Sequence, residues 1–164
     1  MKSNILITSI GGIRGRDLAL KLKKSLKGVK VFTGDKNFQE NMSFFSDGFF
    51  VLQDTKNKKK YISQLIKIIK KNKIKLIIPG SDDEAIIMSK FKEKINKVGA
   101  KVAIVDYKIL KKFENKFYTY KELTQKKIFN IYWEKIESTD ELKSKIKKNL
   151  NKLKKIVIKP VFSR

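Results

Sequence analysis

Short apolar runs alternate with longer amphipathic stretches along the first two thirds of the chain. The apolar runs predict strands at residues 4–8, 29–33, 49–52, 75–78 and 101–105. Apolar residues that recur every three or four positions predict helices at residues 17–26, 61–71 and 82–97. Strands and helices in this order are typical of a parallel sheet covered on both faces. We therefore predict an α/β class with a Rossmann-like parallel sheet, in which a ligand binds beyond the carboxyl ends of the strands.

The pattern changes after about residue 106. Residues 107–125 predict one or two polar helices, and residues 131–136 are a candidate strand. Ser138 and Glu141 form a capping box that opens a helix with Leu142, Ile146, Leu150 and Leu153 in line. A closing β-branched strand is expected at residues 156–159. This β-α-β unit cannot bury its second face alone, so we divide the chain into a domain at residues 1–106 and the opening of another at residues 107–164.

The composition excludes several classes of site. The chain has 164 residues and contains neither cysteine nor histidine, which rules out disulfides, thiolate metal sites, serine–histidine triads and histidine-bound zinc. The first apolar run is too short for a signal peptide, and nothing later approaches about 18 consecutive apolar residues. We expect a cytoplasmic protein with no membrane partner.

The net charge of +24 comes almost entirely from lysine, since 37 of the 40 basic residues are lysines. Most of them fall on the outer faces of the predicted helices. A nucleic-acid partner is disfavoured because arginine, which makes bidentate phosphate and base contacts, is scarce. A lysine-rich nucleic-acid module remains an alternative, and it would bind with a marked salt dependence.

Two loops at predicted strand ends carry candidate chemistry. In SIGGIRGRD, after the first strand, a dinucleotide fingerprint fits poorly because Ile10 occupies its first glycine position. Glycines here allow a tight turn and close helix packing, while Arg14 could meet an anionic substrate. Asp35 ends the second strand, where a ribose-binding carboxylate would lie.

In the second loop, IIPGSDDEA, Ser81 and Glu84 form a capping box. Adjacent acids in a first helical turn diverge, so they are not expected to share one metal ion.

One lysine of the second part stands out slightly from the others. Lys159 ends an apolar run directly before Pro160, so its side chain would emerge at a strand end. A cation in such a place is suited to holding phosphate oxygens. Lys116 lies within residues 107–125 and, by itself, is one lysine among 37.

Taken in order, these features resemble the front of ATP-grasp proteins, most closely the carbamoyl-phosphate synthase large subunit and related carboxylate–amine ligases. The resemblance covers essentially the whole chain and depends on six features in order. They are ILITSIGGIRG, Asp35, FFSDGFF, the Pro79–Asp82–Glu84 pattern, Asn115-Lys116 and VIKP. The chain departs from the family where Asn115 replaces an aspartate and where KKIFN lacks a proline.

The resemblance implies that the chain is an N-terminal fragment of an ATP-dependent ligase, truncated within its ATP-grasp domain. Such a ligase forms an acylphosphate from a small carboxylate, which an amine or ammonia then attacks. ATP and Mg²⁺ would be its cofactors, with the metal ligands beyond residue 164 and none in this fragment. The fragment alone is expected to be inactive, no catalytic residue is assigned, and a homodimer is one option.

The expected ATP-binding residues are Lys116, Lys159 and Arg164, and the expected substrate-facing residues are Gly11, Gly12, Arg14, Asp82 and Glu84. The alternative is a free-standing Rossmann-like domain that binds a nucleotide or nucleotide sugar.

Overall fold

The computed structural model describes residues 3–38, 40, 42–128, 130, 132–149 and 155–162. The chain divides into two compact units, Met1–Leu110 and Lys111–Arg164. The predicted boundary at residue 106 falls slightly before this division, inside the first unit.

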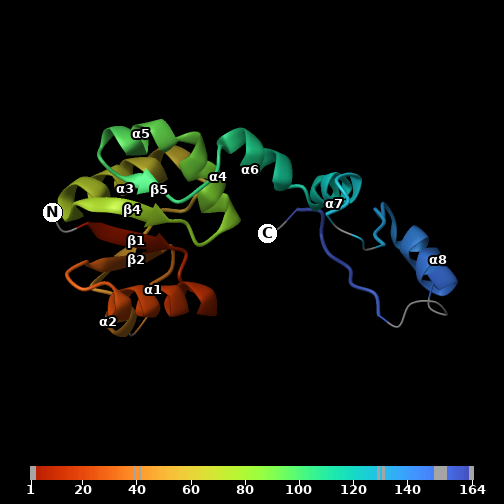
Figure 1. The fold of residues 1–164 in the computed structure, drawn as a ribbon, viewed down its shortest axis with the longest axis horizontal. Coiled ribbons are helices and arrows are strands. Elements are labelled where there is room, and N and C mark those ends of the chain that lie inside the picture. The colour runs from red at the N-terminus through yellow and green to blue at the C-terminus, as the bar shows by residue number, and fades with distance from the viewer. Residues whose placement is uncertain are drawn as a thin grey trace. The chain divides into compact units, whose positions relative to one another are not determined.

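A five-stranded parallel sheet forms the centre of the first unit, in the order β3-β2-β1-β4-β5 (Figure 1). The strand order changes direction at β1 and β4, so the carboxyl ends of these two strands lie at the topological switch point. The predicted α/β class and Rossmann-like sheet are confirmed. The strands are β1 (Asn4–Thr8), β2 (Val31–Asp35), β3 (Gly48–Val51), β4 (Ile74–Ile78) and β5 (Lys101–Val102).

Helices cover both faces of this sheet. Helices α1 and α2 lie on one face, and α3, α4 and α5 lie on the other (Figure 1). In chain order the helices are α1 (Ile13–Ser25), α2 (Met42–Phe45), α3 (Lys58–Asn72), α4 (Asp82–Lys90), α5 (Lys92–Lys97), α6 (Tyr107–Phe113), α7 (Lys116–Gln125) and α8 (Thr139–Asn149).

The two faces of β1 explain its unbroken apolar sequence. Ile5 and Ile7 pack with Ala19 of α1 in one buried cluster, whereas Leu6 points to the other face and packs with Leu65 of α3. Side chains alternate along a strand, so a strand covered on both faces needs apolar residues at every position. Burying each of these large side chains contributes about 1.5–3 kcal/mol.

Helix α3 is the longest helix of the residues that the structure describes, and it has one strongly apolar face. Tyr61, Leu65 and Ile69 are buried, and lysines occupy its exposed positions. Asn57 caps its N-terminus by accepting a hydrogen bond from the Lys60 N–H at 3.2 Å. Lys73, with a φ of 51°, ends the helix in a left-handed conformation.

Three predicted elements are divided or not formed in the structure, and the strand expected at residues 101–105 is shortened to β5. The helix expected at residues 82–97 is two helices, α4 and α5, separated at Phe91, whose φ of −106° and ψ of 18° leave the helical range. In the described residues 132–136 and 155–160, the expected strands are not formed. A strand is stable only where neighbouring strands take up its hydrogen bonds, and these segments have none beside them in the described part of the chain. Leu150 and Leu153, expected to extend α8, lie outside the described residues.

Aromatic side chains organise part of the second unit. Trp133 packs edge-to-face on Phe117 and stacks on Tyr120, with ring centroids 5.4 and 6.1 Å apart. Its indole N–H also donates to the Thr124 hydroxyl at 2.8 Å. Three contacts to one face of α7 therefore hold the segment around residue 133 against that helix.

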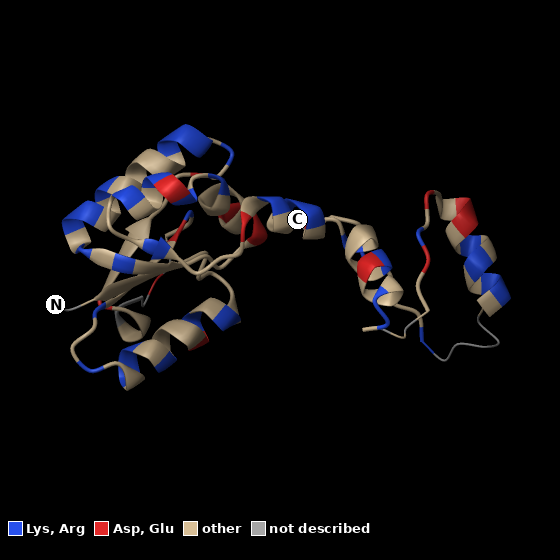
Figure 2. Ribbon diagram, turned by 45° about the horizontal axis from the view of Figure 1, so that its top comes forward, with Lys and Arg blue, Asp and Glu red and all other residues tan. Residues whose placement is uncertain are grey.

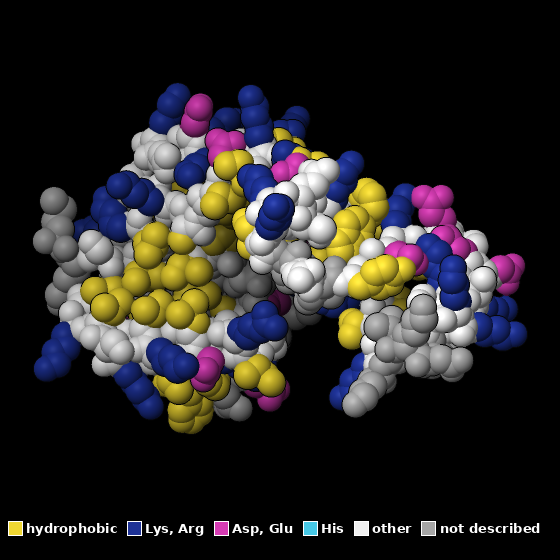
Figure 3. Space-filling view, turned by 45° about the vertical axis from the view of Figure 1, so that its right-hand side comes forward, with side chains coloured by type: hydrophobic (Ala, Val, Ile, Leu, Met, Phe, Trp, Pro, Cys, Tyr) yellow, Lys and Arg dark blue, Asp and Glu magenta, His cyan; other side chains and the backbone are white. Residues whose placement is uncertain are grey.

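Lysines are spread over the helices of both units rather than gathered in one patch (Figure 2). Large hydrophobic side chains are also exposed on the surface, with basic residues among them (Figure 3). Within the described residues, every helix is too short or too polar to cross a membrane.

Candidate functional site

The candidate site of the first unit lies where β1 and β4 end. Gly80, directly after β4, passes so close to β1 that a Cβ atom at this position would lie 2.1 Å from the Thr8 carbonyl oxygen. The Ser9 hydroxyl donates to the Ser81 hydroxyl at 3.1 Å. The loops after β1 and β4, which carry the expected substrate-facing residues, are thus held side by side at the switch point.

The loop after β1 is exposed and is anchored by Asp35. The Gly11 N–H donates to one Asp35 carboxylate oxygen at 2.8 Å, and the Asn37 N–H donates to the other at 3.0 Å. Asp35 is buried, so its carboxylate shapes the loop from beneath instead of standing open to a ribose. Gly12, at the end of this loop, and Arg14, in the first turn of α1, are exposed.

Gly15 allows α1 to approach the loop after β1. A Cβ atom at Gly15 would lie 2.9 Å from the Cα atom of Ile10, which is fully buried. The close helix packing expected from these glycines is therefore present. At Gly12, in contrast, a Cβ atom would meet nothing within 4 Å.

The loop after β4 begins helix α4 with a polar cap. The Ser81 hydroxyl accepts a hydrogen bond from the Glu84 N–H at 3.4 Å, which is one half of the predicted capping box. The Glu84 carboxylate, which the box would direct back to the Ser81 N–H, instead accepts hydrogen bonds from Thr8 and Tyr61. Asp82 and Asp83 are exposed in the first turn, where negative charge suits the helix dipole. Asp82, the expected substrate-facing residue, and Asp83 are therefore both accessible from solvent.

Glu84 differs from the expectation that it faces a substrate. Its side chain is 4% exposed and points inward from α4. One carboxylate oxygen accepts a hydrogen bond from the Thr8 hydroxyl at 2.6 Å, and the other accepts one from the Tyr61 hydroxyl at 2.9 Å. We call Thr8, Tyr61 and Glu84 the Glu84 network. It joins the end of β1, the buried face of α3 and the start of α4 directly beneath the two loops.

Burial raises the pKa of the Tyr61 phenol well above its ordinary value, and the adjacent Glu84 carboxylate raises it further through its charge and its hydrogen bond. The phenol therefore stays protonated and keeps donating to Glu84. A buried carboxylate that accepts two hydroxyl donors is satisfied without a neighbouring cation.

Alkaline pH is expected to destabilise the first unit through Tyr61. In the unfolded chain the phenol ionises near pH 10, roughly its ordinary pKa, but in the folded chain it ionises only at higher pH. The Tyr61 contribution to stability is thus complete below about pH 10 and is lost as the pH rises, by about 1.4 kcal/mol per pH unit.

Urea unfolding followed by circular dichroism checks this expectation. The stability advantage of the natural chain over Tyr61→Phe should narrow between about pH 9 and pH 11. Lysine titration is common to both proteins and cancels in the difference. An advantage that stays constant across this range would contradict the prediction.

The second unit brings together the segments that carry Lys116 and Lys159. The Lys116 N–H donates to the Val161 carbonyl oxygen at 2.9 Å, and an antiparallel bridge joins Asn115 to Phe162. The Lys159 ammonium lies 3.4 Å from the Tyr120 hydroxyl of α7. Two lysines distant in sequence therefore lie on adjoining backbone segments. Arg164, the third expected ATP-binding residue, lies outside the described residues, as does Ser163.

Asn115 serves as the N-cap of α7. Its side-chain oxygen accepts a hydrogen bond from the Tyr118 N–H at 3.2 Å. Asparagine and aspartate are equally effective caps, so the replacement of the family's aspartate preserves the local structure around Lys116. Asn115 does not carry the negative charge that an aspartate would have at this position.

Sequence reasoning missed Thr8, Tyr61 and the Ser9–Ser81 contact. Tyr61 lies on the apolar face of a predicted helix, where it looks like an ordinary core residue, and Thr8 looks like the polar end of a strand. A useful signal would have been that both carry hydroxyls at positions predicted to be buried, since buried hydroxyls need partners.

The part of the chain that the structure describes contains no candidate metal site. There, no three aspartate, glutamate, histidine or cysteine side chains form a group that could hold a metal ion. Lys116 and Lys159, the two lysines expected to hold nucleotide phosphates, lie on adjoining backbone segments.

Solved structures that resemble this chain include two synthetases of one kind. An ADP complex of PurK, an N5-carboxyaminoimidazole ribonucleotide synthetase, has a TM-score of 0.56 and 20% identity, with 90% of this chain and 35% of that chain covered. N5-carboxyaminoimidazole synthetase from Staphylococcus aureus has a TM-score of 0.58 and 16% identity, with 89% and 36% covered.

A third similar structure is the biotin carboxylase subunit of pyruvate carboxylase, with a TM-score of 0.52 and 15% identity, covering 90% of this chain and 33% of that chain. At these identities the likeness shows a shared fold, and the chain spans about a third of the length of these structures. No curated protein matches the chain.

A family model gives the more specific result. Residues 5–103 match the model described as PylC-like, N-terminal domain. The matched residues contain all five strands except Asn4 at the start of β1, together with the Glu84 network and both loops at the switch point. Because this match spans more than half of the chain, the protein belongs to the PylC-like N-terminal domain family, a family of domains that precede ATP-grasp domains.

Proposed function

We propose that this chain is the front part of an ATP-dependent ligase that activates a small carboxylate as an acylphosphate and joins it to an amine or ammonia. The first unit would contribute to the substrate site, and the second unit would be the beginning of the ATP-grasp domain. The narrower similarity to carbamoyl-phosphate synthase stays a prediction. Membership of the PylC-like family and the shared fold of the synthetase and carboxylase structures support the proposal.

The observation that carries the proposal is the pairing of the Lys116 and Lys159 segments in the second unit. The backbone hydrogen bond between Lys116 and Val161 fixes the start of α7 beside residues 159–162. Positioned cations stabilise the charge that develops on phosphoryl oxygens during transfer. ATP bound there would supply the phosphoryl group, and Mg²⁺ held by residues beyond position 164 would neutralise its charge.

In the first unit, the exposed residues at the switch point would hold the carboxylate substrate. Gly11, Gly12 and Arg14 follow β1, and Asp82 follows β4 on the adjoining loop. Arg14 can bind a carboxylate in a bidentate manner. The Gly11 N–H already donates to Asp35, so Gly11 would shape the turn beside the substrate. Glu84 would act from beneath as a positioning residue, because its carboxylate is buried and already accepts two hydrogen bonds.

In the full-length ligase, removing either lysine is expected to reduce acylphosphate formation by about 100-fold, the usual effect of losing one group that stabilises transition-state charge. The assay traps the acylphosphate with hydroxylamine and measures ADP release for a panel of small carboxylates. The variants are Lys116→Ala and Lys159→Ala. The 164-residue chain alone should release no ADP above background, since it has only half of the expected cleft.

Matched controls separate a specific role from the effect of lowering the net charge. Lys121→Ala lies on the same helix as Lys116, and Lys155→Ala lies on the same segment as Lys159, and both controls replace exposed lysines. Their activity should stay within about twofold of the parent. Equal losses in the variants and the controls, or ADP release by the 164-residue chain, would overturn the proposal.

A further inference from the structure

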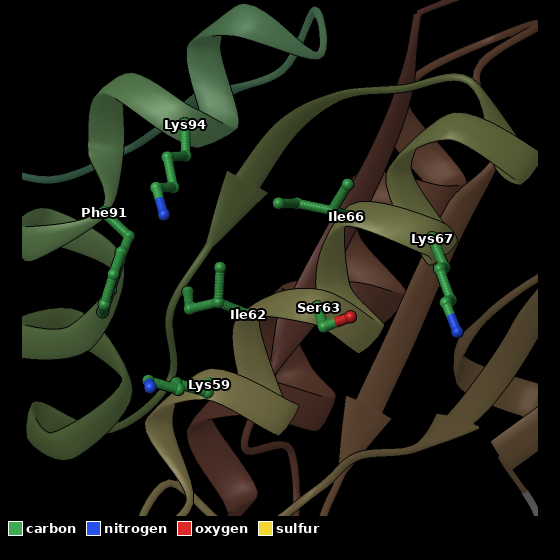
Figure 4. A pocket seen from close by; sticks show the side chains of 7 residues that line it. All are labelled: Lys59, Ile62, Ser63, Ile66, Lys67, Phe91 and Lys94. Carbon is green, nitrogen blue, oxygen red and sulfur yellow. The ribbon is translucent and has the colours of Figure 1, made fainter.

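A hollow with a volume of about 470 Å³ lies between α3 and the junction of α4 and α5. Three apolar side chains form its floor. Figure 4 shows Ile62 and Ile66 of α3 facing Phe91, the residue at which α4 gives way to α5. Ile66 and Phe91 are only partly buried, so apolar surface remains in contact with water. Removing that apolar surface from water through contact with a partner would be favourable in free energy.

Lysines flank this floor on both sides. Lys59 and Lys94 lie on the Phe91 side of the hollow, and Lys67 extends from α3 on the opposite side (Figure 4). All three are exposed. Lys94 lies over the Phe91 ring, with its nitrogen 5.6 Å from the ring centroid. Among the described residues, no carboxylate forms an ion pair with any of these three lysines.

The α3 side of the hollow follows a single helical stripe. Positions 59, 62, 63, 66 and 67 repeat with a spacing of three and four, so lysine begins and ends a run whose middle is isoleucine and serine. Lys59 and Lys67 are eight residues apart, which corresponds to about 12 Å along the helix axis. The stripe is therefore apolar in the centre and cationic at both ends. We call this stripe, together with Phe91 and Lys94, the α3 groove.

We propose that the α3 groove binds an acidic amphipathic helix of a partner protein. Its apolar side chains would cover Ile62, Ile66 and Phe91, and its carboxylates would lie beside Lys59, Lys67 and Lys94. This function is separate from the proposed ligase reaction, because the groove and the candidate site share no residue.

Charge and shape both favour this occupant. Three lysines that pair with no carboxylate of the described residues surround an apolar floor, and they are complementary to an apolar stripe bordered by carboxylates. Carboxylates about two helical turns apart on the partner would match the spacing of Lys59 and Lys67. A nucleic-acid backbone would use the lysines but leave the exposed parts of Ile66 and Phe91 uncovered.

Fluorescence anisotropy with a defined peptide tests the proposal on the full 164-residue chain. The probe is a fluorescein-labelled peptide of about 18 residues, with leucine at helical spacing and glutamate elsewhere. The groove variant is Lys59→Glu/Lys67→Glu/Lys94→Glu. The control variant is Lys70→Glu/Lys71→Glu/Lys97→Glu, which changes the charge equally with exposed lysines of the same two helices, α3 and α5.

At about 0.15 M salt, the natural chain should bind the peptide saturably. The groove variant should lose at least about tenfold in affinity, and the control variant less than about twofold. Ile66→Ser should also weaken binding, because the floor contributes apolar contact. If the groove variant loses its circular dichroism spectrum, Lys67→Gln/Lys94→Gln replaces it, with an expected loss of at least about threefold.

Three results would overturn the proposal. The first is an equal loss in the groove and control variants, which would indicate general attraction to a basic protein. The second is the absence of saturable peptide binding by the natural chain. The third is binding of phosphatidylglycerol vesicles or of a duplex oligonucleotide, but not of the peptide, with that binding lost in the groove variant.

Discussion

Replacing Gly80 with alanine is expected to lower the free energy of unfolding of the first unit by about 3 kcal/mol or more. The new Cβ atom would lie 2.1 Å from the Thr8 carbonyl oxygen and 2.9 Å from that of Ser9. Both neighbours are backbone atoms, so no side-chain rotation relieves the clash. The end of β4 would have to move away from β1, and the two loops at the switch point would separate.

Gly12→Ala is the matched control for Gly80→Ala. Its Cβ atom would meet nothing within 4 Å, and the Gly12 φ of −85° and ψ of 157° suit any residue. Its stability should change by less than about 1 kcal/mol. Hydrogen exchange of β1 and β4 amides measures opening of the first unit without interference from the second. Similar exchange rates in the two variants would contradict the role assigned to Gly80.

Glu84→Ala is expected to cost about 3 kcal/mol. The substitution removes the acceptor of two buried hydroxyl groups, Thr8 and Tyr61, and leaves a gap where the carboxylate was. Each unsatisfied buried donor costs about 1–3 kcal/mol. Loss of the charge itself offsets part of this cost, because a buried carboxylate is poorly solvated. Glu84→Gln, which keeps an acceptor, should cost less than the alanine variant.

Two measurements examine this expectation. Asp83→Ala changes an exposed acid in the same helical turn and should shift stability by no more than about 1 kcal/mol. A double-mutant cycle between Glu84→Gln and Tyr61→Phe should show coupling, since the two side chains share a hydrogen bond. Strictly additive effects, or an alanine variant as stable as the natural chain, would show that the Glu84 network contributes little.

The sheet could be predicted from the sequence because its strands are short apolar runs between polar residues. Residues 4–8 were assigned with the bounds that β1 has in the structure. The start of β2 is displaced from residue 29 to Val31, because Val29 continues the apolar pattern without pairing in the strand. The apolar pattern therefore predicts the order of the strands and helices well, but it predicts their first and last residues less well.

Other features depend on contacts that a linear pattern does not contain. Ile87, Phe91 and Ile95 keep a helical spacing, so the break between α4 and α5 leaves no trace in the apolar periodicity. The strand expected at residues 156–159 has the right residue types, but a strand also requires neighbours. Local propensity cannot show whether neighbours are present.

The candidate site also has some features that could be predicted from the sequence and others that could not. The two loops and their exposed residues follow from glycines and acids at strand ends, which the sequence shows directly. The inward direction of Glu84 depends on hydroxyls located 23 and 76 positions away. Its place in the first helical turn indicates a capping role, and nothing local distinguishes it from its exposed neighbour Asp83.

The segment at residues 155–160 has a consequence for handling the protein. Ile156, Val157 and Ile158 are 41%, 74% and 64% exposed, and they form a run of adjacent β-branched residues. Such a run is a template for intermolecular β-pairing and aggregation. Lys155 and Lys159 border it as charged gatekeepers that repel a second copy. Salt screens this repulsion, so the colloidal stability of the chain should fall as ionic strength rises.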